Sequence, residues 1–293
     1  TRPINGGHYY RRGWELMVDT KNLVGEFTWD TSLTFSKTNS FWKERLPNYD
    51  YQIYQQRENE PMSAYYYYNV TGIINTDRSN MPESQKTLQA EAQLPGCPII
   101  EDKNKDGKID ENDVYMKDNS PAIYVGIGNT FTYKRFEFSF FMYGQFGIQK
   151  YNIAYSAAQA GPLAVDYPEN SNKFAYRLWN SQTNPNGSRP GLAIGKMGAL
   201  PGNAWVNADR ENASFMRMRN ITLAYNLAGN ILGSLQRYVR NIKVYVDAQN
   251  PFILTKFQGF DPEIYTGGGG ASGGSRGEHP QTRTFSLGAN ITF

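Results

Sequence analysis

The segment with the clearest capacity for chemistry is a run of acidic and amide side chains between residues 102 and 113. It reads Asp-Lys-Asn-Lys-Asp-Gly-Lys-Ile-Asp-Glu-Asn-Asp. Oxygen ligands fall at positions 1, 3, 5, 9 and 12 of a calcium loop, with glycine at 6 for the sharp turn and isoleucine at 8. The spacing predicts a site for Ca²⁺, or Mg²⁺ in its place. Its ligands would be Asp102, Asn104, Asp106, the backbone carbonyl of Lys108, Asp110 and Asp113.

A second interpretation of the same segment is a polar external turn without metal. Position 12 is Asp113 rather than glutamate, only one copy of the motif is present, and no EF-hand helices are evident on either side. The carboxylates would then be solvated and balanced by Lys103, Lys105 and Lys108.

Aromatic side chains are the second group that could bind a ligand. They make up 14% of the chain and gather between its regular segments. Flat rings can stack on sugars or pack against peptide side chains, and tyrosine hydroxyls add polar contacts. We select Trp42, Tyr66, Tyr68, Trp179 and Trp205 as candidate substrate contacts. The alternative is that these rings pack the loops together.

Several classes of function are disfavoured by composition and motif content. The chain has 30 basic and 27 acidic residues, so it lacks the positive field on which nucleic-acid binders rely. Its one cysteine, Cys97, cannot form an internal disulfide. No nucleophile elbow, His-Glu-x-x-His zinc motif or phosphate-binding loop is present. We therefore expect neither an enzyme nor an organic cofactor.

Alternation of apolar and polar residues is the dominant pattern along the chain, and it is typical of β-strands. In the last segment, for example, Leu287 and Ile291 alternate with Ser286 and Asn290. The same pattern predicts about seven strands. They span residues 9–19, 25–38, 122–133, 136–148, 213–227, 239–254 and 283–293. The fold should therefore be all-β.

The connections between these segments alternate in length. Residues 20–24, 134–135 and 228–238 form short links, whereas 39–121, 149–212 and 255–282 form long ones. The strands are long enough to cross a bilayer at a tilt, which takes roughly 9–11 residues. Tight turns on one side and long loops on the other are typical of outer-membrane barrels. We expect a transmembrane antiparallel β-barrel segment with long extracellular loops, in the outer membrane of a Gram-negative bacterium.

The two sides of these strands should have different surroundings. Polar alternates would line a water-filled interior, and they include Glu15, Glu26, Asp30, Glu137, Tyr143, Lys243, Asp247 and Gln249. Trp14, Trp29, Phe131 and Phe293 would form an outward aromatic girdle. About seven strands cannot close a barrel, because single-chain bacterial barrels have an even number of strands from eight upward. The remainder of the barrel should lie elsewhere.

Several segments resemble SusC/RagA-type TonB-dependent transporters. The hairpin from Asn129 to Phe140, running on to Gly144 and Gly147, is similar to a late hairpin of that barrel, although Arg135 stands where the family commonly has glycine or asparagine. The strand from Ala213 to Leu227 is similar to the next one. The resemblance extends to the segments Arg12–Glu15, Asn250–Phe252, Gly259–Glu263 and Pro280–Phe293.

This resemblance implies that residues 1–293 are the C-terminal portion of a 22-stranded barrel. The plug domain and the TonB box would lie upstream and not in this chain. It also implies import of oligomeric nutrients, oligosaccharide or oligopeptide, with a SusD-like surface lipoprotein as lid. The TonB-ExbB-ExbD complex would act through the missing N-terminal region. Some of the loop aromatics would then face the lid.

The competing hypothesis is a secreted calcium-binding, β-rich carbohydrate-binding module. It would keep the calcium loop and the aromatic contacts, but it would fold on its own and remain soluble without detergent.

Overall fold

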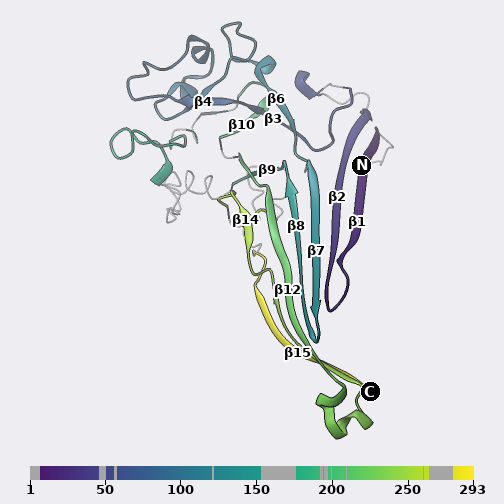
Figure 1. Cartoon of the computed structure of the whole chain (residues 1–293). Helices are drawn as coiled ribbons and strands as arrows, with labels where there is room; N and C mark the ends of the chain where they lie inside the picture. Colours follow the sequence, from purple (N-terminus) through teal and green to yellow (C-terminus); the bar gives the residue numbers. More distant parts are fainter. Residues whose placement is uncertain are drawn as a thin grey trace, which may run out of the picture. The chain divides into compact units, whose positions relative to one another are not determined.

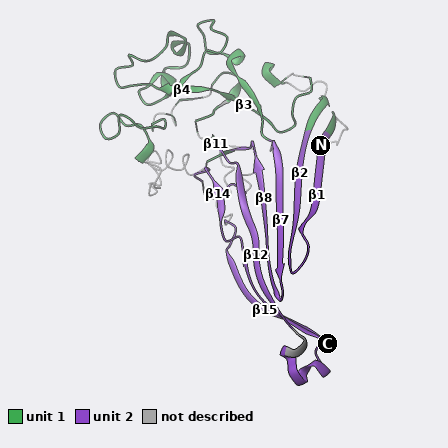
Figure 2. Ribbon diagram, in the orientation of Figure 1, with its two compact units in different colours: residues 1–11, 40–119, 150–211 green, residues 12–39, 120–149, 212–293 purple. Residues whose placement is uncertain are grey.

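The computed structural model describes residues 7–45, 51–55, 58–120, 122–152, 176–191, 194, 197–198, 200–208, 210–259, 261–263 and 280–293. The chain forms two compact units, coloured separately in Figure 2. The first contains residues 1–11, 40–119 and 150–211. The second contains residues 12–39, 120–149 and 212–293.

The long strands form one sheet in the order β1-β2-β7-β8-β12-β13-β15, and the short β14 pairs with β12. They run side by side in Figure 1. Their bounds are β1 (His8–Leu23), β2 (Phe27–Glu44), β7 (Ile123–Tyr133), β8 (Phe136–Phe146), β12 (Phe215–Ala228), β13 (Asn241–Gln249), β14 (Ile253–Thr255) and β15 (Thr284–Thr292). The predicted all-β fold and its antiparallel sheet are confirmed, and each predicted strand is present.

Antiparallel pairing runs in unbroken register through most of this sheet. At the β7–β8 hairpin, Tyr133 pairs with Phe136 and only two residues form the turn. Lys134 has φ of 53°. Two-residue hairpin turns need a positive φ at one or both central positions because that backbone matches the strand twist. Here Lys134, and not Arg135, takes the left-handed backbone.

The predicted strand 239–254 is divided in the structure. β13 ends at Gln249, and Asn250 has φ of 49° before Pro251. Asparagine tolerates the left-handed backbone, and proline has no N–H to donate to a neighbouring strand. β14 follows and pairs with the beginning of β12, where Arg217 lies opposite Ile253. A bulge in β12 between Met218 and Asn220 accompanies this change of partner.

The apolar side of the sheet carries a continuous group of aromatic rings. Phe131 stacks on Trp29 at 5.8 Å between ring centroids and on Phe138 at 6.1 Å. Phe136 meets the edge of Tyr225 at 4.7 Å. Large apolar residues on this side remain exposed, Leu287 by 81%. Soluble monomers rarely leave a continuous apolar surface of this kind uncovered.

The first unit consists of short elements. Its strands are β3 (Ala64–Tyr68), β4 (Val70–Ile73), β5 (Pro98–Ile100), β6 (Tyr115–Asp118) and β10 (Trp205–Val206), while β9 (Gln149–Tyr151) pairs with β11 (Arg210–Asn212). Its 3₁₀ helices are η1 (Ile53–Gln55), η2 (Glu83–Thr87), η3 (Ala90–Gln93), η4 (Glu111–Asp113) and η8 (Pro201–Asn203).

The hydrophobic core of the first unit gathers residues from distant parts of its sequence. It includes Tyr54, Tyr68, Ile74, Leu88, Ala92, Cys97, Ile99, Ile100, Ile109, Val114, Met197, Leu200 and Ala204. Burial raises the pKa of the Cys97 thiol to about 11. The long connections therefore form a packed body with its own core.

The link from β12 to β13 contains a further 3₁₀ helix, η9 (Gly229–Arg237), interrupted at Gly233. None of the helices in the described ranges is long and apolar enough to cross a membrane.

Candidate functional site

The acidic loop at 102–113 is closed by hydrogen bonds from its own backbone. Gly107 N donates to Asp102 Oδ2 at 2.9 Å, and Lys108 N donates to Asp106 Oδ1 at 2.9 Å. Gly107 has φ of 84°, and a Cβ added there would meet no atom within 4 Å. There is room for a side chain at this position. Glycine is favoured here because other residues rarely adopt a positive φ, so a substitution would strain the backbone of the turn.

Asp113 anchors the same loop to the first unit. It is fully buried and accepts hydrogen bonds from Lys103 N at 2.8 Å and from Asp110 N at 2.9 Å. The Asp110 side chain in turn accepts from Asn112 N at 2.8 Å, and Asp110 and Asp113 form a reciprocal capping box at the start of η4. Ile109 inserts into the core. Asp113 thus joins the two ends of the loop and fixes them to the first unit.

The other predicted ligands lie on the exposed part of the loop. Asn104 Nδ2 donates to Asp106 Oδ2 at 3.0 Å, and Asn104 Oδ1 accepts from Asp106 N at 3.2 Å. Within the described ranges, no three His, Cys, Asp or Glu side chains are grouped so that they could hold a metal ion. Calcium or magnesium binding by this loop stays a prediction.

Strand β3 separates its four tyrosines onto two sides. Tyr68 is fully buried, and its hydroxyl donates to the carbonyls of Asp110 and Pro201, each at 3.0 Å. Burial, with the nearby charge of Asp113 as the next cause, raises the pKa of Tyr68 well above its ordinary value. Tyr66 packs on the same core, 5.0 Å from the ring of Tyr54. These two candidate contacts therefore belong to the packed side of the strand.

The opposite side of β3 carries a row of rings that sequence analysis did not single out. Tyr65 stacks on Tyr67 at 5.3 Å, and Tyr67 stacks on Tyr115 of β6 at 5.7 Å. The guanidinium of Arg210 lies 3.7 Å from the Tyr65 ring, and Lys103 Nζ lies 4.7 Å from the Tyr115 ring. Burial lowers the pKa of Arg210. Cations at both ends stabilise such a row through the negative faces of the rings. Alternation within the run 65–68 was the signal that separates the two sides.

Among the described side chains, Trp42 and Trp179 are not stacked on this row of rings. Trp42 lies in β2, with the guanidinium of Arg45 at 5.8 Å from its ring. Trp179 packs against Gly96, where an added Cβ would lie 2.8 Å from Cε3 of the indole. Trp205 lies in β10, where its backbone pairs with that of Tyr67 in β3, and its side chain lies outside the described part of the chain. Substrate contact by Trp42, Tyr66, Trp179 and Trp205 stays a prediction, whereas the fully buried Tyr68 has a structural role.

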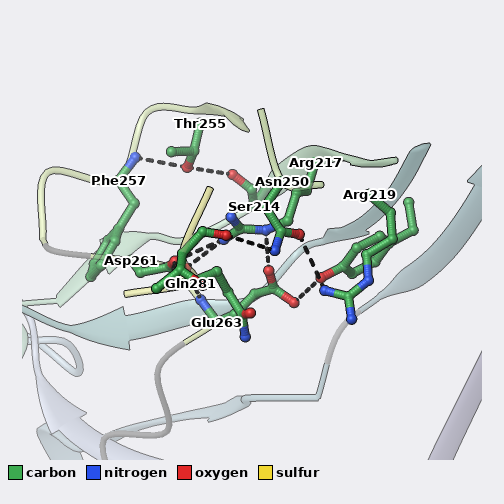
Figure 3. A network of polar contacts seen from close by, with 11 residues as sticks. Ser214, Arg217, Arg219, Asn250, Thr255, Phe257, Asp261, Glu263 and Gln281 are labelled. Carbon is green, nitrogen blue, oxygen red and sulfur yellow. Dashed lines mark hydrogen bonds and ion pairs between the residues drawn. The ribbon is translucent and has the colours of Figure 1, made fainter. Parts of the chain in front are cut away.

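A buried charge cluster lies in the second unit, and sequence reasoning missed it. Arg217 of β12 is 3% exposed and donates through Nη2 to both oxygens of Asp261, at 2.7 and 2.8 Å. Its Nε also forms an ion pair with Glu263, which accepts a hydrogen bond from the hydroxyl of Tyr143. Figure 3 shows the carboxylates of Asp261 and Glu263 beside Arg217.

The same cluster fixes the backbone on both sides of the last long connection. Asp261 accepts from Glu263 N at 2.9 Å and from Gln281 N at 3.2 Å. Asn250, at the end of β13, accepts from Arg219 Nη1 at 3.2 Å and donates to the carbonyl of Thr282 at 3.1 Å. Figure 3 places these residues in one network. The described ends of the connection between β14 and β15 are therefore held against β12 and β13.

Comparison with known proteins identifies what this arrangement resembles. No family model matches the chain. It is 27% identical over 297 residues to the TonB-dependent receptor SusC of Bacteroides thetaiotaomicron, and 26% identical over 309 residues to the TonB-dependent receptor P3 of Formosa agariphila. Each alignment covers 99% of this chain, but only 27% and 29% of the respective relative.

Solved structures show the same fold. A structure of the RagAB peptide transporter matches 98% of this chain with a TM-score of 0.69 at 20% identity, covering 29% of that chain. The RagAB peptide importer in its open-open state matches with a TM-score of 0.65 at 18% identity. The chain resembles a SusC/RagA-family TonB-dependent transporter. The resemblance drawn from its sequence is confirmed.

The relatives are receptors and transporters rather than enzymes, and nothing in them supports a secreted carbohydrate-binding module.

The polar side of this SusC/RagA-like sheet is joined across strands. Lys243 Nζ of β13 lies 2.9 Å from both carboxylate oxygens of Glu137 in β8, so the pair reaches across β12. Thr222 of β12 donates to Asp247 of β13 at 2.7 Å. Sequence analysis predicted that Glu137, Lys243 and Asp247 share one side, and the structure brings Glu137 and Lys243 into contact.

Proposed function

We propose that this chain forms part of the wall and the external loops of an outer-membrane importer of oligomeric nutrients. The observation that carries the proposal is the long-stranded sheet with one exposed apolar side and one polar side joined by ion pairs. In a membrane barrel, the apolar side faces lipid and the polar side faces a water-filled interior. Both edges of the sheet, β1 and β15, would pair with the remainder of the barrel, because unpaired strand edges are not tolerated in lipid.

The substrate class rests on the relatives. The RagAB structures are of a peptide transporter, and the SusC name marks a related receptor. We therefore assign oligopeptide or oligosaccharide import to the whole protein. Residues of this chain would hold the substrate at the mouth, with Trp42, Tyr66, Trp179 and Trp205 as the candidates from sequence. The side chain of Tyr68 is fully buried and is not available for this contact.

Partners are assigned on the same basis. A SusD-like lipoprotein would close over the external loops. The plug and the TonB-binding segment, which contacts TonB-ExbB-ExbD, would lie in the upstream part of the protein. The chain spans under a third of the length of its curated relatives. This chain would therefore contribute part of the barrel wall and the external loops. Arg217 would hold the last long connection in place while the plug moves.

A direct test is binding and uptake by the full-length transporter with its lipoprotein. Labelled oligopeptides and oligosaccharides of matched size would be offered to cells with and without the transporter gene, and to cells lacking TonB. Uptake of one class that requires both genes supports the proposal. Equal uptake in all three strains contradicts it.

A further inference from the structure

The end of the main sheet with the short connections has a distinctive surface. Successive long strands are neighbours in the sheet and run in opposite directions, so the connections between them alternate between its two ends. The β1–β2, β7–β8 and β12–β13 links therefore all lie at this end. The hydrogen bond from Arg240 N to the carbonyl of Thr292, 2.8 Å long, places the end of β15 here as well. Figure 1 shows η9 beside the C-terminus, beyond the ends of β12 and β15.

Large apolar side chains of η9 and of the residue that follows it are exposed. Ile231, Leu235 and Tyr238 are 49%, 54% and 67% exposed, whereas Leu232 is buried. Ile231 and Leu235 lie on either side of the interruption of η9 at Gly233, and Tyr238 follows its last residue. Burying such side chains is favourable at about 25 cal/mol per Å² of apolar surface removed from water. The segment therefore presents a surface that requires a partner.

Basic residues outnumber acidic ones in the short links at this end of the sheet. Lys21, Lys134, Arg135, Arg237 and Arg240 lie in or beside the three links. The same segments, 20–26, 134–135 and 229–240, contain one acidic residue, Glu26. Arg237 and Arg240 are exposed. Guanidinium groups bind phosphate through paired, charge-assisted hydrogen bonds.

The sheet also exposes large apolar side chains at the end where η9 lies. Phe136 is 52% exposed, Ile291 is 51% exposed and Phe293 is 78% exposed. Amphipathic segments with arginine on one side and large apolar residues on the other lie in the interface between head groups and acyl chains. Long basic side chains reach from that depth to the head groups.

We propose that η9 and its flanking arginines form an interfacial anchor on the periplasmic leaflet of the outer membrane. Ile231, Leu235 and Tyr238 enter the boundary of the acyl chains, and Arg237 and Arg240 bind phospholipid phosphates. This inference rests on the proposed function, since it requires the sheet to cross the membrane. It assigns a lipid surface, rather than a protein, as the partner of η9.

The test uses full-length transporter with single nitroxide labels, reconstituted in bilayers of phosphatidylethanolamine and phosphatidylglycerol. Labels are placed at Leu235→Cys, at Ser234→Cys on the same link, and at Val246→Cys on the apolar side of β13. Cys97 is buried and is replaced together with any upstream cysteine. Collision with oxygen reports lipid, and collision with a water-soluble nickel chelate reports water.

The expected result is oxygen-dominated relaxation at 235 and 246 and nickel-dominated relaxation at 234. If Val246→Cys is exposed to nickel, the membrane-spanning proposal fails. If 246 lies in lipid but 235 is nickel-accessible, or is shielded from both reagents by a protein partner, the anchor is overturned. Combining Arg237→Glu and Arg240→Glu with the label at 235 should reduce its oxygen preference, while the label at 246 keeps its value. An unchanged label at 235 contradicts the role of the arginines.

Discussion

Nη2 of Arg217 lies 2.7 Å from Oδ1 and 2.8 Å from Oδ2 of Asp261, although 44 residues separate the two side chains in sequence. Both side chains are almost fully buried. Arg217 belongs to a strand of the sheet and Asp261 to the connection after β14, so this pair joins wall and loop. Removing one partner of a buried pair leaves the other charge uncompensated.

Arg217→Ala should therefore destabilise the full-length protein strongly. Breaking a buried, hydrogen-bonded ion pair costs about 3–5 kcal/mol. Heat-induced unfolding in detergent, followed by the mobility shift on electrophoresis, measures the effect. Arg219→Ala is the matched control, because Arg219 is exposed and its side chain makes a single 3.2 Å contact with Asn250. Equal unfolding temperatures for the two variants would show that the cluster does not anchor the loop.

Tyr68→Phe should destabilise the first unit more than Tyr66→Phe. Tyr68 donates to two carbonyls, and leaving a buried acceptor unsatisfied costs about 1–3 kcal/mol. The buried hydroxyl of Tyr66 has no hydrogen-bond partner among the described residues, so its removal should be nearly neutral. Hydrogen exchange of the first unit in full-length protein checks the difference. If Tyr66→Phe weakens substrate affinity without changing exchange, the predicted ligand contact by Tyr66 gains support.

Alkaline pH should loosen the same unit. The pKa of Tyr68 is raised in the folded state by burial, so its neutral form is favoured there. The unfolded tyrosine ionises near pH 10, and folding stability is thus intact below that pH and falls as the pH rises above it. Hydrogen exchange corrected for its intrinsic pH dependence should show increased opening, and Tyr68→Phe should reduce the increase. Identical pH profiles for both proteins would contradict this assignment.

Gly13→Ala should impair assembly, whereas Gly128→Ala should be tolerated. An added Cβ at Gly13 would lie 2.3 Å from the backbone oxygen of Lys37, which cannot move without distorting β2. At Gly128 the nearest atom would be 3.6 Å away, an ordinary contact. Overpacking of this kind costs about 1–3 kcal/mol. The amount of heat-resistant folded protein in outer-membrane fractions measures it, and equal amounts for both variants would count against the β1–β2 packing.

Calcium should raise the unfolding temperature of wild-type protein if the 102–113 loop binds it. A ligand that binds only the folded state stabilises it by RT ln(1 + [L]/Kd). Asp102→Asn combined with Asp106→Asn should abolish the response. Asp77→Asn is the control, since Asp77 caps a separate exposed turn through Ser79 N. A wild-type protein that contains no calcium after preparation in calcium, and shows no shift, would refute the metal site.

The sheet was largely predictable from sequence because each strand has one apolar side, and alternation such as that of Leu287 with Ser286 records it locally. The break at Asn250 was missed because apolar residues resume at Phe252 and Leu254, so the pattern continues although the pairing partner changes. Pro251 was the available signal.

The polar cluster was not predictable in the same way. Arg217, Asp261 and Glu263 were noted for their resemblance to a family, but contact across 44 residues depends on where an irregular connection lies. Similarly, the run 65–68 predicts that alternate rings face opposite ways, but not which pair faces the core. The core includes residues as distant as Met197 and Ala204, and their packing decides that Tyr68 is buried.

The central claim is that the long strands cross the outer membrane with short links on the periplasmic side and long connections outside. Epitopes inserted after Lys105 and after Ser234 of the full-length protein test it directly in intact and permeabilised cells. The account predicts that the epitope at 105 binds antibody on intact cells, and that the epitope at 234 binds only after permeabilisation. Recovery of both epitopes in the soluble fraction, or labelling of the 234 epitope on intact cells, would contradict it.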